Sequence, residues 1–511
     1  MTGHEHDASM DESDGVERTD GGTAGGTDDV ALDPWGSSTV EDYRKLFEEF
    51  GIESFDDVLD SVSQPHYLMR RGVIFGHREY ERVLEGMADH NAAVLSGFMP
   101  TGDPHIGHKL VFDEIIWHQR HGADAFSLIA DLEAHSARGL DWDEIETHAR
   151  DYILSLLALG FDPEAGELYR QSENREVQDL AFELGIETNL SELQAIYGFD
   201  GETDVSHMQS VVTQMADILY PQLEEPRPTV IPVGPDQDPH VRLARDLAAR
   251  MRTFKVTEAY ASFETDESNR ELLGAVYEQL DGEDEAVVRC EAAAEFVAEQ
   301  YSAPELESSL RAAGKEPLRH RVRFLDRNAD EETFTALIDA IDGEKRVYEG
   351  HIDAFDLGRT DAHELAREIE VEHGGYGFYP PSSIYHRFMT GLTGGKMSSS
   401  IPASHISLLD DPQTGYEKVK SATTGGRDTA EKQRELGGEA DDCPVYELYA
   451  YLLADDDDDL ATTVYEECVT GERLCGDCKE QAAVLMREFL NDHQEKREEV
   501  EPLLDSLDIG L

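Results

Sequence analysis

Short apolar runs alternate with amphipathic stretches along the middle of the chain. Runs typical of buried strands lie at residues 92–98, 126–130, 168–169 and 230–233, and stretches with helical periodicity lie at 107–119 and 143–159. Strands that alternate with helices predict a parallel β-sheet with helices on its faces. Ligands of such sheets bind beyond the carboxyl ends of the strands. We therefore expect an α/β fold with its functional residues at those ends.

The segments around this alternating region have different patterns. Residues 1–38 have many Gly, Asp and Thr and almost no large apolar side chains, so a disordered acidic tail is expected there. Helical patterning begins near Thr39 and indicates a folded N-terminal segment over 39–91. The pattern over 412–511 is helical throughout, except for an acidic run at 455–459 that is expected to be a solvated loop.

Residues 254–375 separate the alternating region, 92–253, from a later part, 376–411, and are predicted to form an inserted domain. This stretch is acidic and partly helical, but it contains a local basic run. The run consists of Lys315, Arg319, Arg321, Arg323 and Arg327. Two interpretations stay open: contact with RNA, or a surface unit whose arginines pair with neighbouring acids.

The charge of the chain points to its environment. It has 43 Lys and Arg against 110 Asp and Glu, a net charge of −67, and the acids are spread along the whole sequence. Self-repulsion on this scale is relieved by salt, so we expect a protein adapted to very high salt rather than one with a local acidic binding site. No apolar run reaches membrane-spanning length and no export signal is evident, which predicts a cytoplasmic protein.

Five cysteines in 511 residues do not make a disulfide framework. Cys468, Cys475 and Cys478 form a cluster with one Cys-x-x-Cys pair, which could contribute zinc ligands. A structural zinc site needs four ligands, and the fourth would come from Cys443 or a distant His. Small buried thiols at a helix start are the favoured interpretation, so no metal ligand is assigned.

Two segments carry candidate chemistry. The first, Pro-Thr-Gly-Asp-Pro-His-Ile-Gly-His at 100–108, follows a strand and opens a helix, where unpaired backbone N–H groups attract anions. His105 and His108 can donate hydrogen bonds to phosphate oxygens, and Gly107 allows close approach of a nucleotide. The second, Gly-Gly-Lys-Met-Ser-Ser-Ser at 394–400, offers a mobile cation and hydroxyl donors. Alone it is typical of a surface loop, but together the two segments favour a nucleotide site.

These segments resemble the two signatures of class I aminoacyl-tRNA synthetases. Segments at 233–246, with Asp-Gln-Asp-Pro, and at 421–438 further resemble the archaeal and eukaryotic tryptophanyl-tRNA synthetases. The resemblance covers roughly 92–253 and 378–500. It implies a Rossmann-like class I synthetase fold with an inserted domain and an all-helical anticodon-binding domain. It also implies a tryptophan–tRNA ligase that uses ATP and Mg²⁺, binds tRNA(Trp), and forms a homodimer.

The resemblance also assigns roles to residues. His105, His108, Lys396, Ser398 and Ser399 would act on the phosphates during catalysis. Thr101, Gly102, Gly107, Asp236 and Met397 would bind ATP. Gln214, Gln237 and Glu133 would line the amino-acid pocket. Two positions depart from the pattern: Ser400 stands where most class I loops end in Lys, and Leu95 stands where human-type members carry a Tyr that helps read the indole.

Alternatives remain open at this point. A tyrosine–tRNA ligase would share the fold and reaction, and a non-catalytic paralogue would use the fold as an RNA-binding or regulatory module. Cofactor nucleotidylyltransferases share the histidine segment, but those chains are shorter and lack a helical C-terminal domain. A basic concentration at the start of the helical region is a candidate tRNA contact, or it forms ordinary salt pairs; its members are Lys418, Lys420, Arg427, Lys432 and Arg434.

Overall fold

The computed structural model describes residues 47, 50–260, 320–395, 397, 401–504, 507 and 509. Its main sheet has seven strands in the order β1-β2-β11-β6-β3-β4-β5. The strands are β1 (Glu53–Ser54), β2 (Ile74–Arg78), β3 (Ala93–Phe98), β4 (Asp124–Ile129), β5 (Gly166–Arg170), β6 (Thr229–Val233) and β11 (Ser382–His386). The expected acidic tail, 1–38, lies outside the described residues.

Five strands of the sheet are parallel, from β11 through β6, β3 and β4 to β5. Chain order therefore reverses between β3 and β6, as at the switch point of a doubly wound sheet. The helices of this region are α5 (Ile106–Arg120), α6 (Asp131–Arg138), α7 (Trp142–Leu159), α8 (Arg175–Leu184), α9 (Leu190–Tyr197), α10 (Val205–Leu219) and α11 (Asp238–Arg250), with short 3-10 turns at Tyr220–Gln222 and Pro235–Gln237. The expected α/β fold is confirmed.

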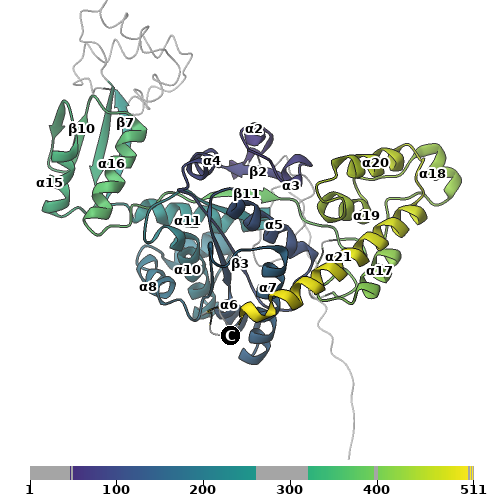
Figure 1. Cartoon of the computed structure of the whole chain (residues 1–511). Helices are drawn as coiled ribbons and strands as arrows, with labels where there is room; N and C mark the ends of the chain where they lie inside the picture. Colours follow the sequence, from purple (N-terminus) through teal and green to yellow (C-terminus); the bar gives the residue numbers. More distant parts are fainter. Residues whose placement is uncertain are drawn as a thin grey trace, which may run out of the picture. The chain divides into compact units, whose positions relative to one another are not determined.

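Side chains that alternate along the strands build two separate cores, one on each face of the sheet. Figure 1 shows α10 and α11 on one side of β3 and α5 and α7 on the other. Val94 packs with α5 and α7, whereas the next residue, Leu95, packs with α8, α10 and α11. Both faces of the central strand are therefore buried, and only its carboxyl end is left for polar residues. The residues that follow β3 and β6 therefore lie at the carboxyl edge of the sheet.

The N-terminal segment adds strands that the helical pattern near Thr39 did not indicate. β2 pairs antiparallel with β11, and β1 pairs antiparallel with β2, so this segment extends the edge of the parallel sheet. Short helices accompany the strands: α2 (Asp56–Leu59), α3 (Tyr67–Arg70) and α4 (Glu81–Ala88).

A second sheet forms within 254–375. It is antiparallel, in the order β7-β8-β10-β9, and has its own apolar core, which includes Phe254, Phe324 and Ile352. The elements are β7 (Phe254–Tyr260), β8 (His320–Asp326), β9 (Lys345–Val347), β10 (His351–Ala354), α15 (Glu331–Ala340) and α16 (Arg359–Glu372).

The basic run of this region is paired where the structure describes it. Arg321 and Arg323 both form ion pairs with Asp353, a buried residue of β10, and Arg327 donates to the carbonyl of Ala249. Lys315 and Arg319 lie outside the described residues. The described arginines thus favour internal pairing over contact with RNA.

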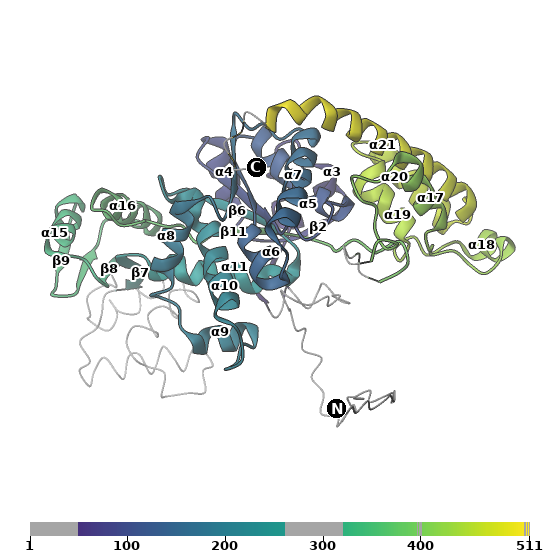
Figure 2. The same ribbon diagram turned by 90° about the horizontal axis from the view of Figure 1, so that it is seen from below.

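The C-terminal region is helical. It contains α17 (Pro412–Ser421), α18 (Ala430–Leu436), α19 (Pro444–Leu448), a π-helical turn (Tyr449–Leu453), α20 (Asp458–Val469) and the long α21 (Cys475–Leu504), which runs beside α17 (Figure 2). The expected loop at 455–459 is shorter than predicted, because α20 already begins at Asp458, with Asp457 as its cap. Among the described residues, no helix is long and apolar enough to cross a membrane.

Most of the candidate basic patch at the start of this region is also paired. The described pairs are Lys418 with Asp410, Lys420 with Glu480, Arg427 with Glu439 and Lys432 with Asp428. Three of these pairs are substantially exposed, so solvent screens them and each cation can exchange its carboxylate for another anion. The geometry favours ordinary salt pairing as the resting arrangement.

Candidate active site

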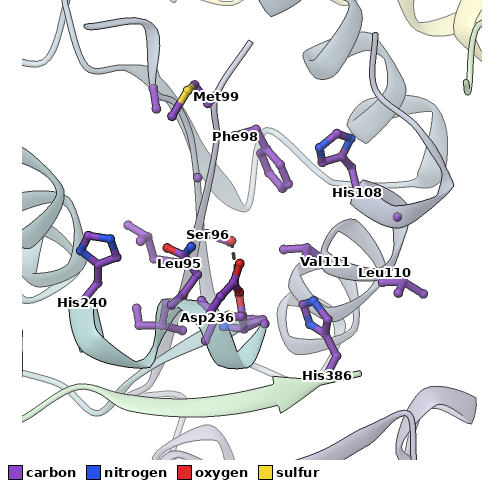
Figure 3. A pocket seen from close by; sticks show the side chains of 18 of the residues that line it. Leu95, Ser96, Phe98, Met99, His108, Leu110, Val111, Asp236, His240 and His386 are labelled. Carbon is purple, nitrogen blue, oxygen red and sulfur yellow. Dashed lines mark hydrogen bonds between the residues drawn. The ribbon is translucent and has the colours of Figure 1, made fainter. Parts of the chain in front are cut away.

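A pocket of about 420 Å³ opens at the point where chain order reverses in the main sheet. Its walls come from β3, from the ends of β6 and β11, and from the first turns of α5 and α11. Figure 3 shows β3 passing between His240 and His108, with Leu95 and Asp236 near the centre of the pocket. The expected site residues among its lining are Glu133, Gln214, Gln237, Asp236, His105, Gly107, His108 and Met397.

His105 and His108 form the N-terminal cap of α5. Nδ1 of His105 accepts a hydrogen bond from the Gly107 backbone N–H at 3.1 Å, and Nδ1 of His108 accepts one from the His105 N–H at 3.1 Å. The two rings stack with centroids 3.8 Å apart. With both Nδ1 atoms used as acceptors, the hydrogen-bond pattern places the ring protons on Nε2. His105 therefore offers an Nε2–H donor, whereas Nε2 of His108 already lies 3.3 Å from the Tyr152 hydroxyl.

Both histidines are neutral at ordinary pH. Burial, together with the nearby His405, lowers the pKa of His108 to about 3. Burial, with His108 and His405 nearby, also holds the pKa of His105 well below its usual range. The pair thus supplies hydrogen bonds at a helix N-terminus without adding a positive charge of its own.

Gly107 is required by the close approach of the His105 ring. A Cβ atom at this position would lie 2.9 Å from Cε1 of His105, which is too short for any side chain. Sδ of Met397 would lie 3.5 Å from the same Cβ atom. Glycine at this position therefore leaves room for the ring of His105, whereas the Met397 sulfur would be in ordinary contact. Thr101 and Gly102 lie in the turn before α5 and are outside the set of described residues that line the pocket.

The segment after the Lys-Met-Ser loop pairs with the histidine motif. The Ile106 N–H donates to the Ile406 carbonyl at 3.1 Å, and the Leu408 N–H donates to the Pro104 carbonyl at 2.8 Å. His405 lies 5.0 Å from His105 between ring centroids. Lys396, Ser398 and Ser399 lie outside the described residues, so only the two ends of their loop are placed beside the pocket.

The start of that loop is held by the helical region. Glu447 of α19 accepts hydrogen bonds from the Thr390 backbone N–H at 2.6 Å and from its hydroxyl at 2.7 Å. Burial raises the pKa of Glu447, and the two bonds from Thr390 act in the opposite direction. One carboxyl group thus connects α19 to the strand-and-loop segment that carries Lys396.

A buried polar cluster closes the inner end of the pocket. Gln171 Nε2 donates to Glu133 Oε1 at 3.1 Å and to Asp217 Oδ2 at 2.6 Å, and the Tyr169 hydroxyl donates to Asp217 Oδ1 at 3.0 Å. Burial raises the pKa of Glu133 to about 7 and that of Asp217 well above its usual range. Carboxyl groups with such shifts in a pocket are candidates for contact with a ligand.

Sequence reasoning did not assign a role to Asp217, Gln171, Tyr169, His405 or Glu447. Asp217 follows Gln214 by three residues, so helical spacing alone places both on one face of α10. That spacing was the one available signal. The others depend on contacts between segments far apart in the chain, which the sequence does not reveal.

The fold and pocket are those of a class I synthetase, and the family comparison agrees. The family model described as tRNA synthetases class I (W and Y) matches residues 87–282 and 359–491. The chain belongs to this family. This confirms the class I resemblance carried by the histidine and Lys-Met-Ser segments.

Named relatives fall within the tryptophan branch of that family. The chain is 68% identical over 498 residues to tryptophan–tRNA ligase 1 of Halobacterium salinarum, covering 95% of this chain and 97% of that protein. It is 47% identical to the tryptophan–tRNA ligase of Methanosarcina acetivorans, covering 93% and 98%. The crystal structure of tryptophanyl-tRNA synthetase from Aeropyrum pernix K1 matches with a TM-score of 0.63 and 32% identity, covering 93% and 98%.

Proposed function

We propose that this chain activates L-tryptophan with ATP and transfers it to the 3′ end of tRNA(Trp). The observation that carries the proposal is the pocket at the sheet's switch point. It has two neutral histidines at a helix N-terminus on one side and a buried carboxyl cluster on the other. The first suits the phosphates of ATP, and the second suits a substrate with an ammonium group. The names of the full-length relatives support tryptophan over tyrosine.

The chemistry of activation requires positioning and charge stabilisation. An oxygen of the tryptophan carboxylate attacks the α-phosphorus, the bond from that phosphorus to the bridging oxygen breaks, and pyrophosphate leaves with the electron pair. His105 and His108 would hold phosphate oxygens through Nε2–H, and Lys396 with Ser398 and Ser399 would meet the charge that grows on pyrophosphate. The tRNA hydroxyl then attacks the adenylate carbonyl and releases AMP.

Mg²⁺ is the ion expected with ATP. It prefers oxygen ligands in octahedral geometry and commonly keeps several waters while the phosphates supply the rest. Glu133 and Asp217 are already joined through Gln171, which leaves Asp236 as the pocket carboxylate outside that cluster. The donor set fits an ion held mainly by phosphate and water. When bound, the ion would neutralise phosphate charge.

The two acids at the amino-acid end of the pocket can be given separate roles. Glu133, with Gln214 and Gln237, would hold the ammonium and carboxylate groups of tryptophan. Asp217 lies on α10 next to the apolar wall formed by Leu95 and Leu128, side chains of the same core. We assign Asp217 as the acceptor for the indole N–H, because an apolar slot with one buried acceptor suits a flat ring with one donor. Leu95 then only shapes the slot.

Amino-acid-dependent pyrophosphate exchange tests the substrate assignment. In molar KCl we expect exchange to require ATP and tryptophan, and tyrosine to be at least about 10²-fold less efficient, because its shorter ring leaves the slot partly empty. The measurement is kcat/KM for each of the twenty amino acids. Comparable exchange with tyrosine would overturn the tryptophan assignment while leaving the class intact.

The role of Asp217 can be tested with a tryptophan analogue that has sulfur in place of the indole nitrogen. The wild-type enzyme should reject this analogue strongly, because the analogue cannot donate the hydrogen bond that Asp217 would accept in addition to those from Gln171 and Tyr169. Asp217→Ala should weaken tryptophan use and remove most of the preference over the analogue. An unchanged preference in the variant would assign the indole contact to another residue.

Glu133 predicts a pH dependence of tryptophan binding. With its pKa near 7, the free enzyme has a neutral acid at about pH 6 and a carboxylate at about pH 8. Affinity for the tryptophan ammonium should therefore rise roughly tenfold from about pH 6 to about pH 8. Fluorescence titration should show this slope in the wild type and in an exposed control, Glu176→Gln, and a flat profile in Glu133→Gln. A slope that persists in Glu133→Gln would point to Asp217 instead.

The remaining assignments concern domains and assembly. We propose that residues 412–511 form the anticodon-binding domain, that 254–375 is an insertion in the catalytic domain, and that the enzyme acts in the cytoplasm as a homodimer. The helical composition of the first and the separate core of the second support the domain assignments. The dimer rests on the family resemblance.

A further inference from the structure

A carboxyl group of α5 is buried one side chain away from the active-site pocket. Glu114 is 1% exposed, and neither of its carboxylate oxygens has a hydrogen bond of good geometry to another described residue. Its described ion pair is with His386, whose Nδ1 lies 3.1 Å from Oε1 of Glu114. Burial raises the pKa of Glu114, and His386 acts in the opposite direction. A buried acid with so few partners adds little to stability, so its place in the fold calls for a functional explanation.

His386, the partner of Glu114, lines that pocket. It is the last residue of β11, and Tyr385 before it pairs with Val233, the last residue of β6. His386 therefore lies at the carboxyl edge of the sheet, level with Gly234, where ligands of such sheets bind. Because Glu114 holds the Nδ1 edge of the ring, the Nε2 edge is the one left for a ligand.

The carboxylate of Asp236 lies close to the segment that carries His386. A Cβ atom on Gly234 would lie 2.7 Å from Oδ1 of Asp236 and 2.8 Å from Cε1 of Phe388, which follows His386 by two residues. Only glycine leaves room for both groups. Asp236 and His386 both line the pocket, and Figure 3 shows their side chains in the lower part of the view. A polar ligand at this wall would therefore meet a carboxylate and an imidazole together.

A ribose presents the groups that match this wall. Each of its two neighbouring hydroxyls can both donate and accept a hydrogen bond, so one suits a carboxylate and the other suits an imidazole in either tautomer. Tryptophan has no hydroxyl, whereas ATP has the 2′- and 3′-hydroxyls of its ribose. The wall formed by Asp236 and His386 therefore fits the sugar of the nucleotide better than it fits the amino acid.

We propose that His386 binds a ribose hydroxyl of ATP through Nε2, and that Glu114 is the positioning residue that fixes the orientation of the imidazole. The assignment rests on the proposed function, because ATP is the nucleotide of that reaction. The hydrogen bond made by one ring nitrogen sets the proton and the orientation of the other, so without Glu114 the ring can turn a carbon edge toward the sugar. A site built around a hydrogen bond to a hydroxyl discriminates against analogues that lack it.

Deoxy analogues of ATP test the contact with His386. Affinity for ATP, 2′-deoxy-ATP and 3′-deoxy-ATP is measured by calorimetry in molar KCl without tRNA, whose terminal ribose would compete. The wild-type enzyme should bind the analogue that lacks the contacting hydroxyl about tenfold more weakly than ATP. His386→Asn keeps an N–H near the position of Nδ1 but removes Nε2, so it should lose this preference and keep the preference over the other analogue. The matched His386→Gln, whose amide reaches the position of Nε2, should keep part of it.

Two substitutions of Glu114 separate positioning from a merely structural role. Glu114→Leu removes the carboxyl group at nearly constant volume and should remove most of the preference for the same hydroxyl. A merely structural role would weaken ATP and its analogues alike, whereas loss of orientation removes the difference between them. Glu114→Gln still offers an oxygen to the Nδ1–H of His386 and should restore most of the preference. Because Glu114→Leu can fail to fold, the two His386 variants provide an independent test.

Three outcomes would overturn the proposal. The first is a preference for ATP over both deoxy analogues that is the same in the wild type and in His386→Asn. The second is a folded Glu114→Leu variant that discriminates as the wild type does. The third is an effect of His386 seen only with purine riboside triphosphate, which lacks the 6-amino group, because it would place adenine at this wall. Tryptophan-dependent exchange is measured in parallel, and its absence from a wild-type enzyme that still selects ribose through His386 would count against the proposed function alone.

Discussion

Lys396→Ala is expected to lower the rate of tryptophanyl-adenylate formation by about 10²–10³-fold while changing tryptophan affinity by less than about threefold. In the proposed mechanism this lysine would meet negative charge that grows on pyrophosphate only as the transition state forms. Loss of one such donor typically costs about 2.7–4 kcal/mol. A rate effect without a binding effect is the signature of an interaction made only in the transition state.

The described ends of the Lys-Met-Ser loop are held together by backbone hydrogen bonds. The Met397 N–H donates to the Met389 carbonyl at 3.2 Å, and the Gly391 N–H donates to the Gly395 carbonyl at 2.7 Å, so the loop is closed at its base. Gly394 and Gly395 have φ angles of 87° and 74°, a backbone conformation that other residues rarely adopt. Met389 and Met397, which the first of these hydrogen bonds joins, both line the pocket.

The experiment compares two lysines. Lys496 lies on α21 and pairs with Asp492 one turn away, so Lys496→Ala is a control for loss of a positive charge. Single-turnover adenylate formation and equilibrium tryptophan binding are measured for both variants in molar KCl. Equal losses of rate and affinity in Lys396→Ala would show that this lysine only holds the substrate. A wild-type rate would remove it from the reaction.

The parts of the fold that the sequence predicted well are those set by local pattern. β3 was expected at 92–98 and lies at Ala93–Phe98, and α5 was expected at 107–119 and lies at Ile106–Arg120. In both cases residues with a defined conformational preference bound the run of buried residues. His105, for example, caps the start of α5. Local chemistry was sufficient there because it decides both the element and its end.

The parts that the sequence did not predict depend on distant partners. The short strand β2 pairs with β11, which lies more than three hundred residues later in the chain, and β1 in turn pairs with β2. The link between Glu447 and Thr390 likewise crosses from one region to another. Of the two acids in the pocket cluster, the sequence predicted only Glu133. The other, Asp217, lies on α10 and is joined to Glu133 through Gln171.

The charge of the protein raises a separate question, since pairing cannot neutralise it. Many described cations already bind acids, including Arg71 with Asp458 and Arg497 with Asp151. Even if every cation bound one acid, the net charge of −67 would remain. The unpaired carboxylates therefore repel one another in the compact state, and only ions in solution can screen that repulsion.

Transfer to dilute buffer is therefore expected to unfold the enzyme and abolish exchange activity, and molar KCl is expected to restore both. The screening length falls from about 30 Å at 0.01 M salt to about 3 Å at 1 M, below the usual separation of surface charges. The melting temperature should rise steeply with KCl. Sorbitol at equal osmolality should reproduce little of this rise, because it stabilises by exclusion and does not screen charge.

A variant can show that carboxylate repulsion is the cause. Glu488, Glu495, Glu498 and Glu499 are exposed on α21, and changing all four to Gln removes four negative charges while keeping size and helix propensity nearly constant. The KCl concentration at half-unfolding should fall in this variant, and the difference from the wild type should vanish at several molar KCl. Circular dichroism across a KCl series provides the measurement. A melting temperature that is highest in dilute buffer, or an unchanged midpoint in the variant, would show that the enzyme's acids serve a purpose other than tolerance of high salt.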